Sequence, residues 1–116
     1  MPEDTYPLEE IVARIEESVR RDTGIDAKRR NELLGLLTRL KGELQGLERT
    51  RRDAAHSIAG LAGVAAHEAR RPDKPEGLLT HAVEGLAMSA EGLEASHPDL
   101  VRTVNDLCTI LANMGI

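Results

Sequence analysis

Aromatic side chains are almost absent from this sequence of 116 residues, which contains one Tyr, no Phe and no Trp. This scarcity excludes base-stacking platforms for single-stranded nucleic acid, aromatic cages for cations and the aromatic belts of membrane proteins. Leu and Ala together supply 30 residues, whereas Val and Ile together supply 12. Because β-sheets favour β-branched and aromatic residues, the composition predicts a single all-α domain over residues 1–116.

Cysteine and long apolar segments are equally scarce. Cys108 is the only cysteine, so no disulfide can form within the chain, and its neighbours Leu107 and Leu111 predict a buried thiol rather than a nucleophile. The first residues lack the apolar region of a signal peptide. The longest uncharged run, residues 54–67, is shorter than the roughly 20 residues that span a membrane. We therefore expect a cytoplasmic protein without membrane insertion.

The charge of the chain is uneven. The net charge is −5, yet residues 28–52 contain eight bases and three acids. This segment has two interpretations, a solvated helix face with ion pairs between successive turns, or a basic surface for nucleic acid or an acidic protein. The interleaved acids and the lack of aromatic residues favour the solvated face, so we disfavour nucleic acid as a partner.

Apolar periodicity and turn residues predict four helices, at about 7–22, 26–70, 76–96 and 98–114. The second helix has a stripe from Leu33 to Ala65 that is apolar except for Arg51 and whose spacings alternate between 4 and 3, as in a coiled coil. A second stripe with the same spacing begins at Leu79 and continues through Pro98 without losing phase. We expect Pro98 to kink one long arm, and the alternative is that Pro98 separates two helices.

The two stripes match residue by residue if the chain forms a long antiparallel hairpin about residues 71–75. The short first helix then covers one end of the hairpin, and the Ala- and Gly-rich other end is left with only two helices. Two helices bury too little apolar area in water, so we expect this end to form a helical bundle with a second chain, as a C2 homodimer. The predicted self-association surface comprises Ala54, Ile58, Leu61, Ala65, Val83, Leu86, Ala90 and Leu93.

The C-terminal part carries a motif. Residues 93–101 read Leu-Glu-Ala-Ser-His-Pro-Asp-Leu-Val, and residues 111–116 read Leu-Ala-Asn-Met-Gly-Ile. This stretch resembles the end of the short bacterial proteins of the domain of unknown function 4404 family, although Leu93 stands where that family usually has an aromatic residue. The resemblance implies a helical fold with a short first helix and a Leu-rich second helix. It implies no activity.

No arrangement of residues typical of an active site or a metal centre occurs within the chain. The histidines at positions 56, 67, 81 and 97 lack the spacing of metal ligands on a helix, so we predict no catalytic, cofactor-binding or metal site in one chain. A metal site shared between two chains stays open. His97 falls on the second stripe, which allows two interpretations, a pH-sensitive buried residue or a partly exposed residue bound to a nearby acid or backbone group.

These observations favour a non-enzymatic, oligomeric interaction or scaffold module, with a homodimer as the expected assembly and a further protein partner as a possibility. The alternative is a protein that binds nucleic acid or an acidic protein through residues 28–52. An enzyme whose active site lies between subunits is the least favoured interpretation.

Overall fold

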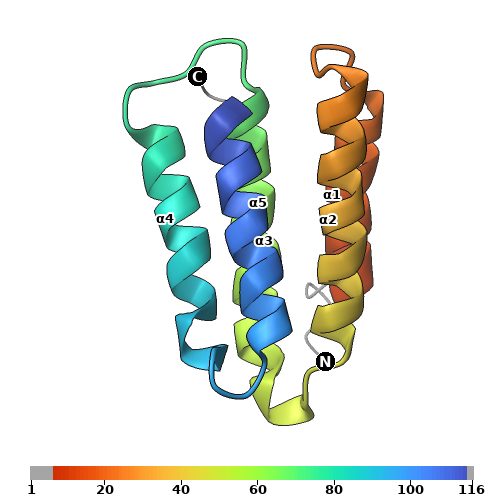
Figure 1. The fold of residues 1–116 in the computed structure, drawn as a ribbon, viewed down its shortest axis with the longest axis vertical. Coiled ribbons are helices and arrows are strands. Elements are labelled where there is room, and N and C mark those ends of the chain that lie inside the picture. Colours follow the sequence, from red (N-terminus) through yellow and green to blue (C-terminus); the bar gives the residue numbers. More distant parts are fainter. Residues whose placement is uncertain (1–6, 115–116) are drawn as a thin grey trace.

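The computed structural model describes residues 7–114, which form five α-helices without β-strands and so confirm the all-α prediction (Figure 1). The helices are α1 (Leu8–Arg21), α2 (Ala27–Gln45), α3 (Arg52–Arg70), α4 (Leu78–Ala90) and α5 (Pro98–Met114). Two single 3-10 turns, η1 (Arg49–Arg51) and η2 (Glu91–Leu93), lie after α2 and α4. Tyr6 and the last two residues of the C-terminal motif, Gly115 and Ile116, lie outside the described residues.

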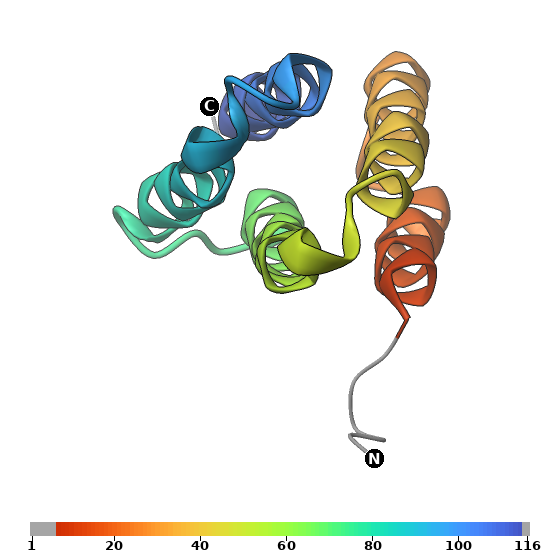
Figure 2. The same cartoon turned by 90° about the horizontal axis from the view of Figure 1, so that it is seen from below.

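Successive helices run in opposite directions, and α3 lies between α1 and α4 (Figures 1 and 2). Helix α3 contacts α1, α4 and α5, whereas α2 packs against α1 and α5. The stripe predicted on α2 is confirmed as core, because Leu33, Leu37, Leu40 and Leu44 are fully buried. The bundle therefore has α1 and α2 on one side of α3, and α4 and α5 on the other.

Helix α1 agrees with the helix predicted at 7–22, and one buried acid ties it to α2. Glu16 on α1 accepts hydrogen bonds from the Thr38 hydroxyl at 2.8 Å and from Lys41 Nζ at 3.1 Å. The Glu16 side chain is only 7% exposed. A carboxylate in such a position needs these donors, because a buried charge without partners is costly. The three residues thus set how α1 is placed along α2.

The prediction of one continuous helix over 26–70 is wrong, because the structure divides this segment into α2 and α3. Helix α2 ends at Gln45, and the backbone becomes extended at Glu48, where ψ is 160°. Gly42 and Gly46 weaken the helix near this point, because glycine loses more backbone freedom on folding than other residues. The chain turns here and runs back along itself as α3.

The expectation that Pro98 kinks one long helix is also wrong. Helix α4 ends at Ala90, η2 follows, and Pro98 begins a separate helix that packs against α4 in the opposite direction. Proline suits this first position, since its ring pre-sets the helical φ and its missing N–H would have no partner within the helix. The alternative interpretation, in which Pro98 separates two helices, therefore describes the chain.

The predicted self-association surface lies inside a single chain, which is a third correction. Five of its residues are buried and the other three, Ala54, Leu61 and Val83, are partly buried against the core. The buried residues are Ile58, Ala65, Leu86, Ala90 and Leu93. Because the long hairpin is folded back, α1 and α5 of the same chain cover the surface that was assigned to a second chain.

Helix α3 has a second apolar stripe, which explains why it can contact α1 as well as α4 and α5. Ala55, Ala59, Ala62 and Ala66 are all buried, with spacings of 4, 3 and 4. Ile15 of α1 packs beside Gly63, where an added Cβ would lie 3.6 Å from Ile15 Cδ1. Small side chains on this face let α1 approach the backbone of α3 closely, so the alanines build the interior of one chain.

Candidate binding groove between α2 and α5

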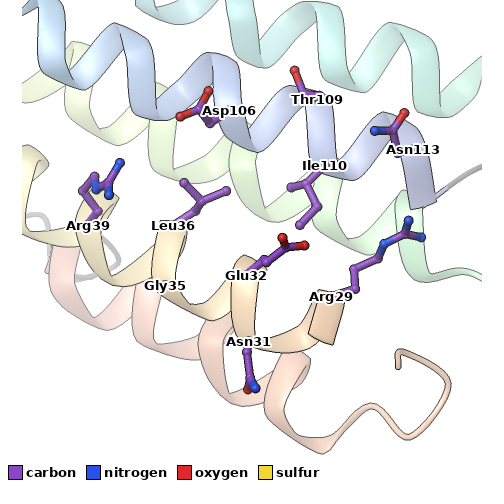
Figure 3. Close-up of a pocket in the computed structure, with 10 residues that line it drawn as sticks. All are labelled: Arg29, Asn31, Glu32, Gly35, Leu36, Arg39, Asp106, Thr109, Ile110 and Asn113. Atoms are coloured by element: carbon purple, nitrogen blue, oxygen red, sulfur yellow. The ribbon is translucent and has the colours of Figure 1, made fainter. Parts of the chain in front are cut away.

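A groove of about 630 Å³ runs between α2 and α5 (Figure 3). These two helices lie on the side of the bundle away from α3 (Figure 2). Residues of α2 that are three or four positions apart form one wall, because they share a helix face. Residues of α5 form the other wall. The lining residues are Arg29, Asn31, Glu32, Gly35, Leu36, Arg39, Asp106, Thr109, Ile110 and Asn113.

The floor of the groove is apolar and partly exposed. Leu36 on α2 and Ile110 on α5 point toward each other across the groove, and both side chains are half-buried against the core (Figure 3). Gly35 leaves open space beside them, since a Cβ added there would meet no atom within 4 Å. A helix or another rounded apolar surface could therefore approach the α2 backbone at this point.

Four charged side chains surround this floor. Arg29 and Glu32 lie toward one end of the groove, whereas Arg39 and Asp106 lie at the other end (Figure 3). None of these four side chains forms an ion pair within residues 7–114. Elsewhere in the bundle, arginines such as Arg70 are paired with acids. The groove thus combines an apolar centre with charges of both signs that have no ion-pair partner in the described chain.

Sequence periodicity missed the two apolar residues of the groove. Leu36 and Ile110 lie outside both predicted stripes, since they fall between the positions that face the core. The available signal was the presence of Leu34 and Leu36 beside the stripe residues Leu33 and Leu37. Such extra apolar residues widen the apolar face of a helix, which often indicates a second contact surface.

His97 lies at a helix junction rather than within the core. Its Nε2 atom is 2.9 Å from Oε1 of Glu48, and its side chain is 26% exposed. A hydrogen bond from the backbone N–H of Glu48, followed by the one with His97, holds the pKa of the Glu48 carboxyl below its ordinary value. This geometry agrees with the second interpretation of His97, in which it is a partly exposed residue that binds a nearby acid.

The other histidines lie apart from one another and from the groove. Nδ1 of His56 lies 3.0 Å from the carbonyl oxygen of Arg52, and His81 lies 3.6 Å from Glu84. His67 is exposed on α3. Within residues 7–114, no group of three or more His, Cys, Asp or Glu residues is placed to bind a metal ion.

The basic segment 28–52 does not form one continuous face. Lys41 is bound to Glu16, and Arg30 donates hydrogen bonds to the backbone carbonyls of Asp22 and Ile25 at 2.8 and 2.6 Å. The bases near the end of the segment are exposed at the turn between α2 and α3. The segment is thus divided between internal contacts, the groove and a turn.

Arg30 and Arg70 stabilise the turn between α1 and α2. Arg70 Nη1 lies 3.2 Å from Oδ2 of Asp22, whose Oδ1 accepts a hydrogen bond from the Gly24 N–H at 2.8 Å. The hydrogen bond from Gly24, with the further contribution of Arg70, lowers the pKa of Asp22. This turn fixes the start of α2 and therefore the position of Arg29 at the end of the groove.

Comparison of the sequence and the structure with protein-family models, curated proteins and solved structures gave no match. The resemblance to the family of unknown function 4404 therefore depends on the quoted residues alone. Among the helices of residues 7–114, none is both long and apolar enough to cross a membrane.

Proposed function

We propose that this protein is a non-enzymatic interaction module whose contact surface is the groove between α2 and α5. The observation that supports this proposal is the partly exposed apolar pair Leu36 and Ile110, surrounded by four charged side chains without ion pairs in the described chain. Protein interfaces commonly combine an apolar centre with a polar and charged rim. A fold that leaves such a combination exposed is suited to binding a helical surface of another chain.

A photo-reactive amino acid at Gly35 tests this proposal in the native host. The Cβ of a benzophenone side chain at this position meets open space, since no atom lies within 4 Å of it. Gly60 provides a matched control, since it is also an exposed helical glycine with no atom within 4 Å of an added Cβ, but it lies on α3. We expect light to produce a covalent protein adduct from position 35 and none from position 60.

A Leu36→Asp substitution in the Gly35 probe protein sharpens this experiment. The substitution places a charge on the apolar floor, so we expect the adduct to disappear while the circular dichroism of the helical fold is retained. Equal adducts from positions 35 and 60, or an adduct that survives Leu36→Asp, would contradict the proposal. The absence of any adduct from position 35 would contradict it as well.

Nucleic-acid binding through residues 28–52 is the weaker alternative. Binding to phosphates requires several bases on one face, with a strong dependence on salt. Arg30 and Lys41 are instead engaged with the backbone carbonyls of a turn and with Glu16. A gel-shift titration at low and high salt measures this alternative directly, and a steep salt dependence would favour it.

A further inference from the structure

The charges of the groove can be compared with those of a second copy of the same chain, and the inference drawn from them rests on the proposed function. The whole chain carries a net charge of −5, which repels a second copy at long range. The groove is different, because its two arginines and its two acids sum to no net charge. The lining of the groove therefore adds no net charge of its own to the repulsion between two copies.

The order of the charges selects one arrangement of two copies. A closed dimer requires a two-fold axis, and when two facing grooves are aligned in parallel this axis lies either across or along the groove. With the axis across the groove, α2 faces α2 of the partner in reverse, which brings Arg29 toward Arg39 of the partner subunit. The contact between the two α2 helices then contains four arginines and only two acids, Glu32 of each copy, so it carries a net positive charge and this arrangement is disfavoured.

An axis along the groove gives the opposite result. Helix α2 of one copy then lies over α5 of the other at the same level, and the two helices run antiparallel. Arg39 and Asp106 lie at the same end of the groove on opposite walls, so each of them faces the opposite charge on the partner. Two symmetric ion pairs form, and the paired apolar floors of Leu36 and Ile110 lie beside them.

We propose that this chain forms a C2 homodimer through the groove between α2 and α5, with Arg39 of each protomer bound to the partner's Asp106. The apolar floors of the two grooves form the centre of the interface. The short side chains of Gly35 and Thr109 allow the helices of the two copies to approach closely.

Charge reversal tests this pairing with the full-length chain. Both Arg39 and Asp106 are exposed in the single chain, so we expect Arg39→Asp and Asp106→Arg to fold normally. Each variant places like charges opposite each other across the two-fold axis, and we expect sedimentation equilibrium to show dimerisation weakened by about tenfold or more. Arg49→Asp provides a control for Arg39→Asp, since it changes the net charge equally at an exposed position outside the groove.

Mixing the two variants gives the decisive result. The acid introduced at position 39 of one variant then faces the arginine introduced at position 106 of the other. The unchanged Asp106 of the first variant likewise faces the unchanged Arg39 of the second. We expect the mixture to form a heterodimer with an affinity close to that of the wild type, although each variant alone is largely monomeric. The variant that contains both substitutions in one chain is also expected to regain dimerisation.

The outcomes separate this inference from the proposed function. A wild-type chain that stays monomeric over the whole concentration series overturns the homodimer, while an adduct from Gly35 with a different protein leaves the interaction groove supported. A dimer that Arg39→Asp and Asp106→Arg leave unchanged also overturns the homodimer through this groove. A mixture that shows no heterodimer overturns the pairing of Arg39 with Asp106.

Discussion

Nε2 of His97 lies 2.9 Å from Oε1 of Glu48, and this contact joins the two places where the predicted long hairpin turns back on itself. Glu48 precedes η1 between α2 and α3, whereas His97 precedes α5. Both corners are at the same end of the bundle (Figure 1). The two arms of the hairpin therefore turn at the same level, and the folded hairpin buries its own alanine-rich half.

The corner contact predicts a pH-dependent contribution to stability. The folded protein lowers the pKa of Glu48, so the carboxylate stabilises the fold above its ordinary pKa of about 4.5 and loses this effect as the pH falls through the lowered value. We expect Glu48→Gln to lower the melting temperature at pH 7. The difference from the wild type should shrink in thermal melts as the pH falls below about 4.5, the ordinary pKa of the group. A difference that persists unchanged at acidic pH would contradict this assignment.

Substitutions of the buried Glu16 on α1 and of its partner Lys41 should have strongly non-additive effects on the free energy of unfolding. Lys41→Met leaves the Glu16 carboxylate with Thr38 as its one side-chain donor within the described chain, which should cost about 1–3 kcal/mol in the free energy of unfolding. The double variant Glu16→Met with Lys41→Met should lie within about 1 kcal/mol of the wild type, because an apolar pair replaces a partly buried ion pair. Urea denaturation of these two variants and of the single variant Glu16→Met measures the values, and additive losses would contradict the pairing.

The close approach of α1 to α3 predicts different tolerance at two glycines. Gly63 faces Ile15, so Gly63→Leu should displace α1 and destabilise the fold by about 1–3 kcal/mol. Gly60→Leu should be neutral or stabilising, because its side chain enters open space and leucine forms helix better than glycine. Thermal melts of the two variants make the comparison, and equal effects would be inconsistent with α1 packing on this face of α3.

The thiol of Cys108 should react slowly with alkylating reagents in the folded protein. Burial raises the pKa of Cys108, and its Sγ lies 3.6 Å from the carbonyl oxygen of Val83 on α4. The reactive thiolate is therefore scarce and shielded at about pH 8. We expect iodoacetamide to modify Cys108 slowly in the native protein and rapidly in urea, as measured by mass spectrometry. Equal rates in the two conditions would show that the thiol is not enclosed between α4 and α5.

The helices could be predicted in large part because their signals are local. Asp26 caps α2 by accepting a hydrogen bond from the Arg29 N–H at 2.8 Å, and Pro98 begins α5 as its ring geometry favours. The buried leucines from Leu33 to Leu44 follow the predicted spacing. Each of these features depends on residues within one or two helical turns of each other. They can therefore be predicted directly from the amino-acid sequence.

The candidate groove could not be predicted in this way. Leu36 and Ile110 are 74 positions apart, and each of them is simply an apolar residue beside a core stripe. The charges of Arg39 and Asp106 likewise belong to ordinary exposed helix faces until α5 is placed beside α2. A surface made by two distant helices depends on how they diverge from each other, which no local spacing specifies.

Composition and spacing are enough to specify that the chain is aliphatic and all-α, and which residues form its main apolar stripes. The folding back of the hairpin at Glu48 and His97, by which one chain covers its own alanines, follows only from the packing of the helices in space. A spacing of 4 and 3 is the same whether a helix continues or resumes in phase after a corner. Burial within one chain avoids the translational and rotational entropy that a second chain would lose on association, so the alanine stripe is covered by α1 and α5.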